Sequence, residues 1–263
     1  MKITVLGCGS SMGVPAAGGF WGVCDPAEPK NERTRSSILV QHRDTTVLVD
    51  ASYDLRMHLN QHKVRDIDAV LLSHSHADHI SGLDDLRAIA FHHKKIIPLY
   101  SDLETITELH QRMPYQFVTD ETGIYSQFVE GRVIPQSGHL TIGDIRVDVF
   151  KQDHGTCSSL GFRFGEIAYS VDMLDLDDTA LEALKGVKVW IVDGGGYHAP
   201  DEKLTTHANF RRVREWVDYL KPDMTYVTVL TSKMDYKTLC DELPPHIRPC
   251  YDGMEIDMAG NVR

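Results

Sequence analysis

The stretch LLSHSHADHI, residues 71–80, places three histidines and an aspartate directly after two leucines. Side chains two positions apart lie on the same face of an extended backbone, so His74 and His76 point together. Asp78 and His79 follow after the chain has changed direction. Imidazole nitrogens and carboxylate oxygens are ligands that zinc, manganese and iron accept. The stretch therefore predicts a metal-binding loop at the end of a strand.

Length and composition indicate a compact globular protein. The chain has 263 residues, of which 42% are hydrophobic and 25% charged, and we expect a single domain over residues 1–263. The formal net charge of −11 argues against binding along an extended nucleic acid. We expect a small phosphorylated substrate instead, and the oligomeric state, including a homodimer, stays open.

The sequence shows no signal for a membrane or for secretion. The N-terminal apolar run ITVL, residues 3–6, is too short for a signal-peptide core, and no stretch approaches the length of a transmembrane span. The five cysteines are odd in number and widely spaced, with no C-x-x-C pair. We therefore expect a cytoplasmic protein with reduced thiols.

The order of predicted elements favours an α/β fold. Short runs rich in β-branched residues predict strands at 3–6, 36–42, 45–52, 69–74, 145–152, 160–164, 167–172, 187–194 and 224–230. Helices are expected at 53–63, 83–93, 103–113 and 207–220. This order is typical of a sandwich in which helices cover the outside of two packed sheets, with the chemistry in loops at strand ends.

Two further candidate ligands lie at the ends of other predicted strands. His154 follows the strand at 145–152, and Asp172 ends the strand at 167–172. A single histidine or aspartate in such a position more often caps a turn. Together with the loop at 71–80, however, they indicate a metal centre built from three segments.

These residues resemble the metallo-β-lactamase superfamily, whose signature is an H-x-H-x-D-H loop followed by a later histidine and a later aspartate. The sequence is most similar to the branch of phosphoribosyl cyclic phosphate phosphodiesterases of phosphonate degradation. The similarity lies in GCGSSMGVP, LVDAS, YSVD, TTHAN and YDGMEI, spread over nearly the whole chain. The resemblance implies an αββα sandwich with the metal site at one edge of the sheets.

The resemblance also implies a role for each candidate residue. One divalent ion, Mn²⁺ or Zn²⁺, would be held by His74, His76 and His154, and a second by Asp78 and His79, with Asp172 bridging the two. Asp78 and His207 would be catalytic, His207 by contacting the phosphate or protonating the leaving oxygen. Asp50 would orient a ligand histidine. We expect Asp153 and Asp193, beside the site, to be structural.

The sequence departs from the pattern at one expected ligand. The family carries a last histidine on a late strand, and alignment of VTVLTSKMDY places Val229 at its position. Valine cannot coordinate a metal ion. The second ion would then bind weakly, the enzyme would work with one ion, or the protein would bind a ligand without turning it over.

The reaction that the resemblance implies is hydrolysis of a phosphodiester by a metal-bound hydroxide, with a small, cyclic sugar phosphate or nucleotide as the substrate. Three alternatives stay open. They are an RNA-processing nuclease, which the acidic composition disfavours, a one-metal iron oxygenase acting on thiols, and a ligand-binding protein with an impaired second site.

Overall fold

Two mixed β-sheets pack against each other in the computed structural model, which describes residues 1–124, 126–197, 206–257 and 260–262. The first sheet has the order β14 (Glu255–Asp257), β1 (Lys2–Gly7), β2 (Ser37–His42), β3 (Thr45–Val49), β4 (Ala69–Leu71), β5 (Ile97–Ser101) and β6 (Val129–Val133). The second has the order β13 (Ile247–Pro249), β12 (Met224–Thr228), β11 (Val189–Asp193), β10 (Ile167–Ser170), β9 (Ser158–Phe164), β8 (Ile145–Asp153) and β7 (Gly138–Ile142).

Each sheet is antiparallel in one half and parallel in the other. The strands from β14 to β3 pair antiparallel, and β3 to β6 pair parallel. The second sheet repeats this arrangement, antiparallel from β7 to β10 and parallel from β10 to β13. Parallel strands need crossover connections, and helices of the chain supply several of them.

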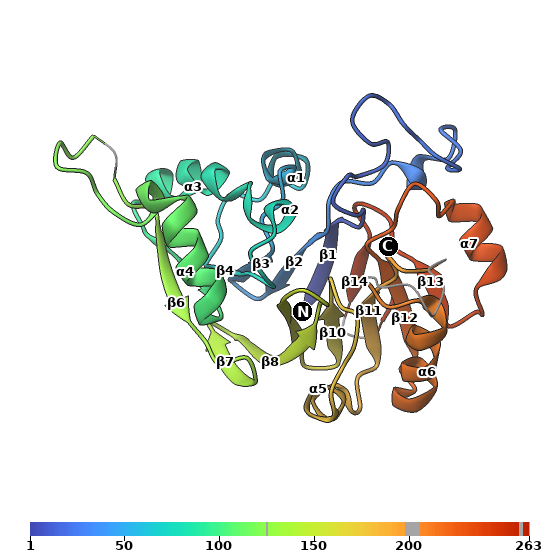
Figure 1. Cartoon of the computed structure of the whole chain (residues 1–263). Helices are drawn as coiled ribbons and strands as arrows, with labels where there is room; N and C mark the ends of the chain where they lie inside the picture. Colours follow the sequence, from blue (N-terminus) through green and yellow to red (C-terminus); the bar gives the residue numbers. More distant parts are fainter. Residues whose placement is uncertain (125, 198–205, 258–259, 263) are drawn as a thin grey trace.

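Helices cover the outer faces of both sheets (Figure 1). They are α1 (Leu55–Gln61), α2 (Ala77–Ile80), α3 (Leu86–His93), α4 (Leu103–Arg112), α5 (Asp178–Leu184), α6 (Phe210–Leu220) and α7 (Tyr236–Glu242). In Figure 1, α1 to α4 lie with the first sheet, and α5 to α7 lie with the second. Among the described residues, none of these helices combines the length and apolarity needed to cross a membrane.

Alternation along the strands divides the apolar residues between two cores. In β3, Val47 and Val49 pack into the cluster that fills the space between the sheets, whereas Leu48 packs under α1 and α3. Trp190 of β11 is fully buried in the first of these clusters. Because side chains alternate between the faces of a strand, β1, β2, β3 and β4 each contribute to both layers.

The predicted αββα sandwich is confirmed. All the expected strands and helices are present, although the last helix begins at Phe210 and leaves His207 in the loop before it. The extent of one domain over residues 1–263 and a cytoplasmic location stay predictions.

Three residues with left-handed backbone follow strands at one end of the sandwich. Asp50 follows β3, Asp172 lies just beyond β10, and Val229 follows β12, with φ of 61°, 49° and 59°. Such conformations are unfavourable for residues other than glycine, most of all for β-branched ones. Strained backbone of this kind gathers at functional sites.

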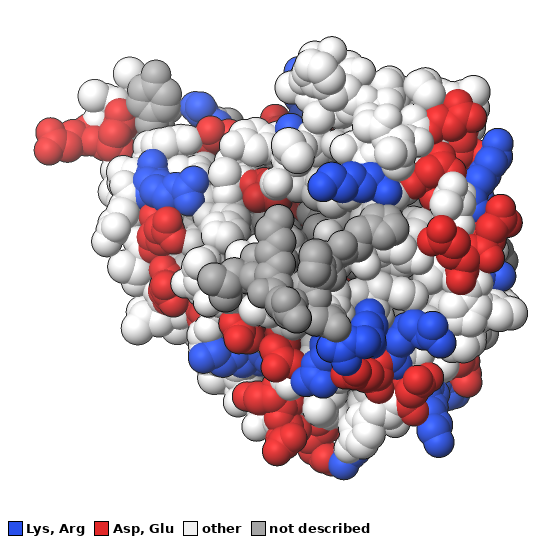
Figure 2. Space-filling model, turned by 45° about the vertical axis from the view of Figure 1, so that its right-hand side comes forward, with Lys and Arg blue, Asp and Glu red and all other residues white. Residues whose placement is uncertain are grey.

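Basic and acidic side chains are mixed over the described surface. On the face shown in Figure 2, Lys and Arg side chains stand beside Asp and Glu side chains and do not form one broad basic area among the described residues. This distribution agrees with the net charge of −11.

Candidate metal centre

The loop after β4 brings three imidazole rings together. β4 ends at Leu71, and α2 begins at Ala77 directly after His76, whose backbone is extended. The ring centroid of His74 lies 4.4 Å from that of His76 and 4.4 Å from that of His79. The expected change of direction thus occurs at the start of α2, which turns His79 back toward His74.

The second sheet supplies the other two ligands. His154 follows β8, and its ring centroid lies 5.1 Å from that of His74 and 5.2 Å from that of His76. Asp172 lies beyond β10, and its Oδ2 is 3.7 Å from His74 Nε2, 3.5 Å from His79 Nε2 and 3.4 Å from His154 Nε2. Ligand atoms that share a tetrahedral zinc ion lie about 3.3 Å apart, given Zn–N bonds of about 2.0–2.1 Å.

The potential ligand atoms fall into three groups that meet at Asp172, each within 4.8 Å. Two of them, His74, His76, His154 and Asp172, and Asp78, His79 and Asp172, are the sets that the family resemblance implies. The third is Asp172, Asp193 and His207, in which Asp193 is already hydrogen-bonded to His207. The structure therefore brings all six predicted ligands together.

Unpartnered imidazole nitrogens indicate that these residues suit metal ions. His74 Nε2 and His79 Nε2 are buried and have no hydrogen-bond partner. A buried polar atom without a partner is costly, and both of these nitrogens lie within 3.7 Å of Asp172 Oδ2, so a cation held between them and the carboxylate would serve all three groups. Nitrogen donors beside carboxylates are the set that zinc and manganese accept.

Asp50 fixes the orientation of two of these rings. Its Oδ2 accepts a hydrogen bond from His79 Nδ1 at 2.8 Å and one from the Ser73 hydroxyl at 2.9 Å. Ser73 Oγ in turn lies 3.0 Å from His74 Nδ1, and Ser73 N donates to Asp50 Oδ1 at 2.8 Å. This network holds the proton of each ring on Nδ1 and leaves Nε2 directed at Asp172, as outer partners of metal ligands do.

His154 is oriented in the same way by the backbone. Its Nδ1 donates to the carbonyl oxygen of Thr206 at 2.8 Å, which again leaves Nε2 for an ion. Burial lowers the pKa of His154 and that of His74, so both rings are neutral near pH 7 and keep a lone pair on Nε2.

Two carboxylates reverse the effect of burial on the pKa of His79. Burial lowers the pKa of His79, but the charges of Asp172 and Asp50 outweigh this effect and raise it well above the usual value. A cation held beside the same two carboxylates would satisfy them as the proton does.

His207 lies beside the cluster and is held by Asp193. Its Nδ1 donates to Asp193 Oδ2 at 2.7 Å, and its ring centroid is 5.3 Å from that of His154. The charge of Asp193 raises the pKa of His207 to about 9, against the opposing effect of burial. Gly195 leaves room for the ring, since a Cβ there would come within 3.0 Å of it.

Asp193 and Asp153 differ in their surroundings. Asp193 is fully buried and also accepts hydrogen bonds from the backbone of Met173 and Gly195, so it positions His207. Asp153 is exposed and caps the turn at Gly155.

Comparison with known proteins decides the family. Residues 45–228 match the family described as "Beta-lactamase superfamily domain", which is more than half of the chain. The chain belongs to the metallo-β-lactamase superfamily. Its ligand cluster and this membership together indicate a site for divalent metal ions.

The proteins to which this superfamily member is similar carry the names of different enzymes. The crystal structure of "a New Diphosphatase from the PhnP Family" is similar with a TM-score of 0.85 and 28% identity, over 97% of this chain and 95% of that one. An octanoyltransferase of Porphyromonas gingivalis is 30% identical over 99% of this chain and 52% of its own length. A ribonuclease Z of Methanopyrus kandleri is 25% identical over 49% of this chain and 43% of its own length. The chain thus spans about half the length of the curated relatives it matches.

Val229 directly follows β12, at the same end of the parallel strands as Asp172 and Asp193. Thr228 pairs with Asp193, which holds His207, and Val229 is the next residue. It is buried and apolar, so it offers no donor to an ion. The second group of ligands therefore keeps only Asp78, His79 and Asp172 among the described residues.

One residue near the cluster was not expected from the sequence. Cys157 Sγ lies 4.0 Å from His76 Nε2. The signal in the sequence was its place three positions after His154, in the same turn before β9.

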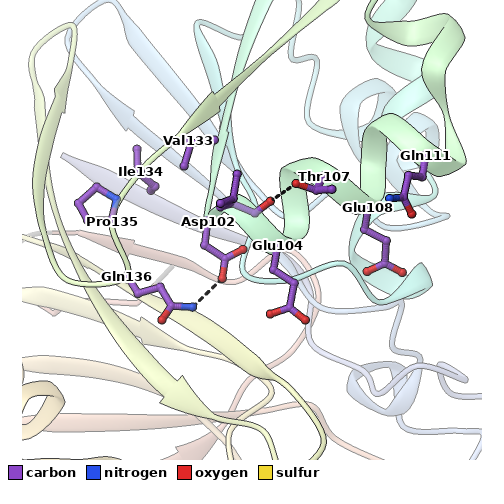
Figure 3. Close-up of a pocket in the computed structure, with 10 residues that line it drawn as sticks. Asp102, Glu104, Thr107, Glu108, Gln111, Val133, Ile134, Pro135 and Gln136 are labelled. Carbon is purple, nitrogen blue, oxygen red and sulfur yellow. Dashed lines mark hydrogen bonds between the residues drawn. The ribbon is translucent and has the colours of Figure 1, made fainter.

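A groove of ≈ 720 Å³ lies beside the metal-binding loop (Figure 3). Glu104 and Glu108 of α4 line one side, and the segment from Val133 to Gln136, after β6, lines the other. Glu108 also accepts a hydrogen bond from the hydroxyl of Ser75, which stands between the first two histidines of the loop. Glu108 therefore connects the groove to the metal-binding loop, although none of the residues that line the groove belongs to the ligand groups.

Proposed function

We propose that this chain hydrolyses a phosphodiester bond in a small molecule, with a cyclic sugar phosphate or a cyclic nucleotide as the substrate class. The observation that carries the proposal is the convergence of six ligand side chains in two groups that share Asp172. Two-metal sites of this kind are suited to displacement at phosphorus. Mn²⁺ or Zn²⁺ is the expected metal.

The bound cations would polarise a phosphoryl oxygen and lower the pKa of a water molecule to about 7. The residues of the chain have separate tasks. Asp172 belongs to both ligand groups and would hold both cations. Asp78, in the group that lacks a further histidine, would hold the second cation together with His79.

His207 would supply the proton that the leaving oxygen needs. Its Nδ1 is committed to Asp193, so the proton to be transferred is the one on Nε2. Asp193 orients the ring and favours its protonated form, as a buried carboxylate partner does for a general acid.

Charge supports a small substrate. The net charge of −11 and the two glutamates of the groove would repel a long polyanion, whereas a single phosphate can be neutralised by the cations. This argues against the ribonuclease alternative, although two curated relatives are named ribonuclease Z.

The names of the relatives partly support the proposed hydrolysis of a phosphodiester. The diphosphatase of the PhnP family matches nearly the whole chain, and its name agrees with chemistry at phosphorus. The octanoyltransferase guides the proposal less, because this chain spans 52% of that protein.

The test is hydrolysis by the protein stripped with a chelator and then supplied with Mn²⁺ or Zn²⁺. We expect release of nitrophenolate from bis-p-nitrophenyl phosphate, and faster turnover of a five-membered cyclic ribose phosphate or a 2′,3′-cyclic nucleotide than of a precursor tRNA. His154→Ala should abolish turnover, and the matched change His92→Ala, at an exposed surface histidine, should not.

Two results would contradict the proposal. Failure to release nitrophenolate with any divalent metal would favour a protein that binds its ligand without turning it over. Consumption of oxygen by the iron-loaded protein with a thiol substrate would favour the oxygenase alternative.

A further inference from the structure

The loop from residue 11 to residue 23, which we call the N-terminal loop, is uncharged and exposes three large apolar side chains. Residues 3–24 contain no Asp, Glu, Lys or Arg, although 25% of the chain is charged. Met12, Phe20 and Val23 are 63%, 69% and 66% exposed. Several exposed apolar groups on one uncharged loop are typical of a binding surface rather than of a solvated turn.

Both ends of the N-terminal loop are anchored to the segment that follows Val229. At the start of the loop, Ser10 N donates to the carbonyl oxygen of Leu230 at 3.1 Å. At its end, Val23 N donates to the carbonyl oxygen of Ser232 at 2.8 Å. The loop therefore lies against the turn after β12, beside one of the three left-handed residues at the metal end of the sandwich.

Arg35 joins the N-terminal loop to the segment that follows Asp50. Its Nε donates to the carbonyl oxygen of Ser11 at 3.0 Å, and its Nη1 forms an ion pair with Asp54 Oδ1 at 3.0 Å. Asp50 is the residue that orients ligand histidines of the metal-binding loop. In Figure 1 the N-terminal loop belongs to the blue segment at the top of the molecule, at the same end as α1 and α2. It thus borders the end of the sandwich at which the metal ligands gather.

Backbone hydrogen bonds fix the position from which the Phe20 side chain projects. Ala16 N donates to the carbonyl oxygen of Phe20 at 2.9 Å, and Phe20 N donates to that of Ala16 at 3.2 Å. The phenyl ring rests on Gly18, since a Cβ there would come within 2.7 Å of it. Gly18 also has φ of 94°, which other residues rarely adopt. The ring is therefore held by a tight turn while most of its surface stays in solvent.

We infer that the Phe20 ring is the stacking surface for the base of a cyclic nucleotide whose phosphate lies at the metal centre. The inference rests on the proposed function and selects the nucleotide from its two substrate classes. Stacking on an aromatic ring holds a base through its π-face and needs no hydrogen bond from the protein. Phe20 is then a residue that determines specificity and takes no part in the reaction itself.

Charge favours a base at this position. The protein has a net charge of −11, so a further anionic group of a substrate would be repelled by its surface. A nucleobase is uncharged near pH 7, and every base offers a π-face. The N-terminal loop carries no charge of either sign, so it can bind the base while the cations bind the phosphate.

A membrane or a second copy of the chain fits this loop less well. Segments that bind anionic membranes carry Lys and Arg beside their apolar residues. The first charged residues after the N-terminal loop are instead Asp25 and Glu28. A stable dimer buries about 800 Å² of each partner, which is more than one short loop supplies.

The first experiment compares two substrates that differ in the base. We expect the metal-loaded wild type to hydrolyse 2′,3′-cyclic AMP with a lower KM than a five-membered cyclic ribose phosphate. Phe20→Ala should raise the KM for 2′,3′-cyclic AMP about 5- to 100-fold, as expected when a base loses its stacking partner, with little change in kcat. The KM for the cyclic ribose phosphate should not change, because that substrate has no base.

Further variants separate the aromatic ring from apolar volume alone. Phe20→Trp keeps a π-face and should retain the low KM for 2′,3′-cyclic AMP. Phe20→Leu has no π-face and should behave like Phe20→Ala. The matched control is Val23→Ala, which removes an equally exposed apolar side chain from the same loop. It should leave the KM for both substrates unchanged.

The second experiment measures stacking and needs no turnover. The probe is 2-aminopurine riboside 3′-phosphate, a fluorescent analogue of the hydrolysis product, whose emission falls when its base stacks on an aromatic ring. We expect titration with the metal-loaded wild type, or with Val23→Ala, to quench the probe. Phe20→Ala should quench it little, because no ring remains at this position.

The outcomes separate this inference from the proposed function. An equal rise in KM for both substrates in Phe20→Ala would show that the ring supports the loop, and would overturn the inference. Unchanged KM values would also overturn it, and loss of vesicle binding or of a dimer in sedimentation would then assign the ring to a membrane or to a second copy. If the wild type hydrolyses neither substrate but quenches the probe through Phe20, the proposed reaction fails and the base-binding surface stands. A KM effect limited to 2′,3′-cyclic AMP, together with quenching that depends on Phe20, supports the inference.

Discussion

At the scale of single residues, Asp50 contributes most to the order of the cluster without touching an ion. It accepts hydrogen bonds from His79 and Ser73, and Ser73 reaches His74. Asp50→Asn should keep the backbone, because asparagine also tolerates the left-handed conformation. It removes the charge and one acceptor, so we expect zinc affinity to fall about 10- to 100-fold in a competition titration with a chromophoric chelator.

The control for Asp50 is the same change at a surface carboxylate. Asp66→Asn weakens partly exposed contacts with Lys95 and His93, away from the cluster, and should leave zinc affinity unchanged. Equal affinity of Asp50→Asn and the wild type would show that this network does not support the metal ligands.

Val229 offers the opposite experiment, the gain of a ligand. A β-branched residue at φ 59° costs about 1–2 kcal/mol of strain, whereas histidine is enriched in this conformation. Val229→His should therefore be tolerated and should raise the metal-to-chain ratio in elemental analysis. Val229→Leu is the control without a donor atom. No increase in metal content or turnover would remove the reason for placing a family ligand at this position.

His207 is expected to act on the leaving group. His207→Gln keeps a hydrogen-bonding side chain but no transferable proton, so turnover of a substrate with a poor leaving group should fall about 10²- to 10⁴-fold. Turnover of a nitrophenyl ester, whose leaving group needs no proton, should fall far less. The control is His139→Gln, an exposed position on β7. Equal losses on both substrates would exclude the acid role.

At the scale of elements, the sequence predicted the strands and helices in which burial sets the pattern of apolar residues. β3 and β11 are buried runs of β-branched residues, and helices α1, α3, α4 and α6 were found, whereas the short helices α2, α5 and α7 were missed. The missed strands β6 and β7 lie at sheet edges and are mostly exposed, and β13 and β14 have three residues each. Their hydrogen bonds to a neighbouring strand define them, and no local sequence pattern records that pairing.

In the candidate site, too, the sequence predicted what a local pattern records and missed what depends on the packing of distant segments. His74, His76, Asp78 and His79 could be predicted because they lie in one short stretch with a recognisable spacing. The contact of Cys157 with His76 could not, because it depends on how a turn of the second sheet meets a loop of the first.

Helix α4 supports the metal-binding loop from outside. Arg112 Nη1 donates to the carbonyl oxygen of Ser75 at 2.8 Å, and Glu108 accepts from its hydroxyl. Arg112→Ala should loosen the loop and weaken zinc binding about 2- to 10-fold, the equivalent of one hydrogen bond. The same titration with Arg132→Ala, which removes an exposed pair with Glu130, should show no change. An unaltered affinity in Arg112→Ala would mean that the loop holds its shape without α4.

At the scale of the whole molecule, the metal centre joins the two sheets. The loop after β4 belongs to the first sheet, whereas His154 and Asp172 follow strands of the second. The sheets are also held by the apolar cluster between them, so the fold does not depend on metal alone. An ion bound by both sheets nevertheless adds its binding energy to the free energy of unfolding, because the unfolded chain cannot assemble these ligands.

Removal of metal should therefore lower the melting temperature. Free zinc at about 100 times its dissociation constant stabilises the folded state by about 2.7 kcal/mol, which corresponds to a shift of about 5–10 °C for a chain of this size. Thermal unfolding followed by circular dichroism, with zinc and with excess chelator, measures this shift. His154→Ala should lose most of it, since the second sheet then contributes one ligand fewer, while His139→Ala should retain it. A melting temperature that does not change when elemental analysis shows the zinc removed would mean that the ion is held by one sheet alone, and that His154 and Asp172 do not share it with the loop after β4.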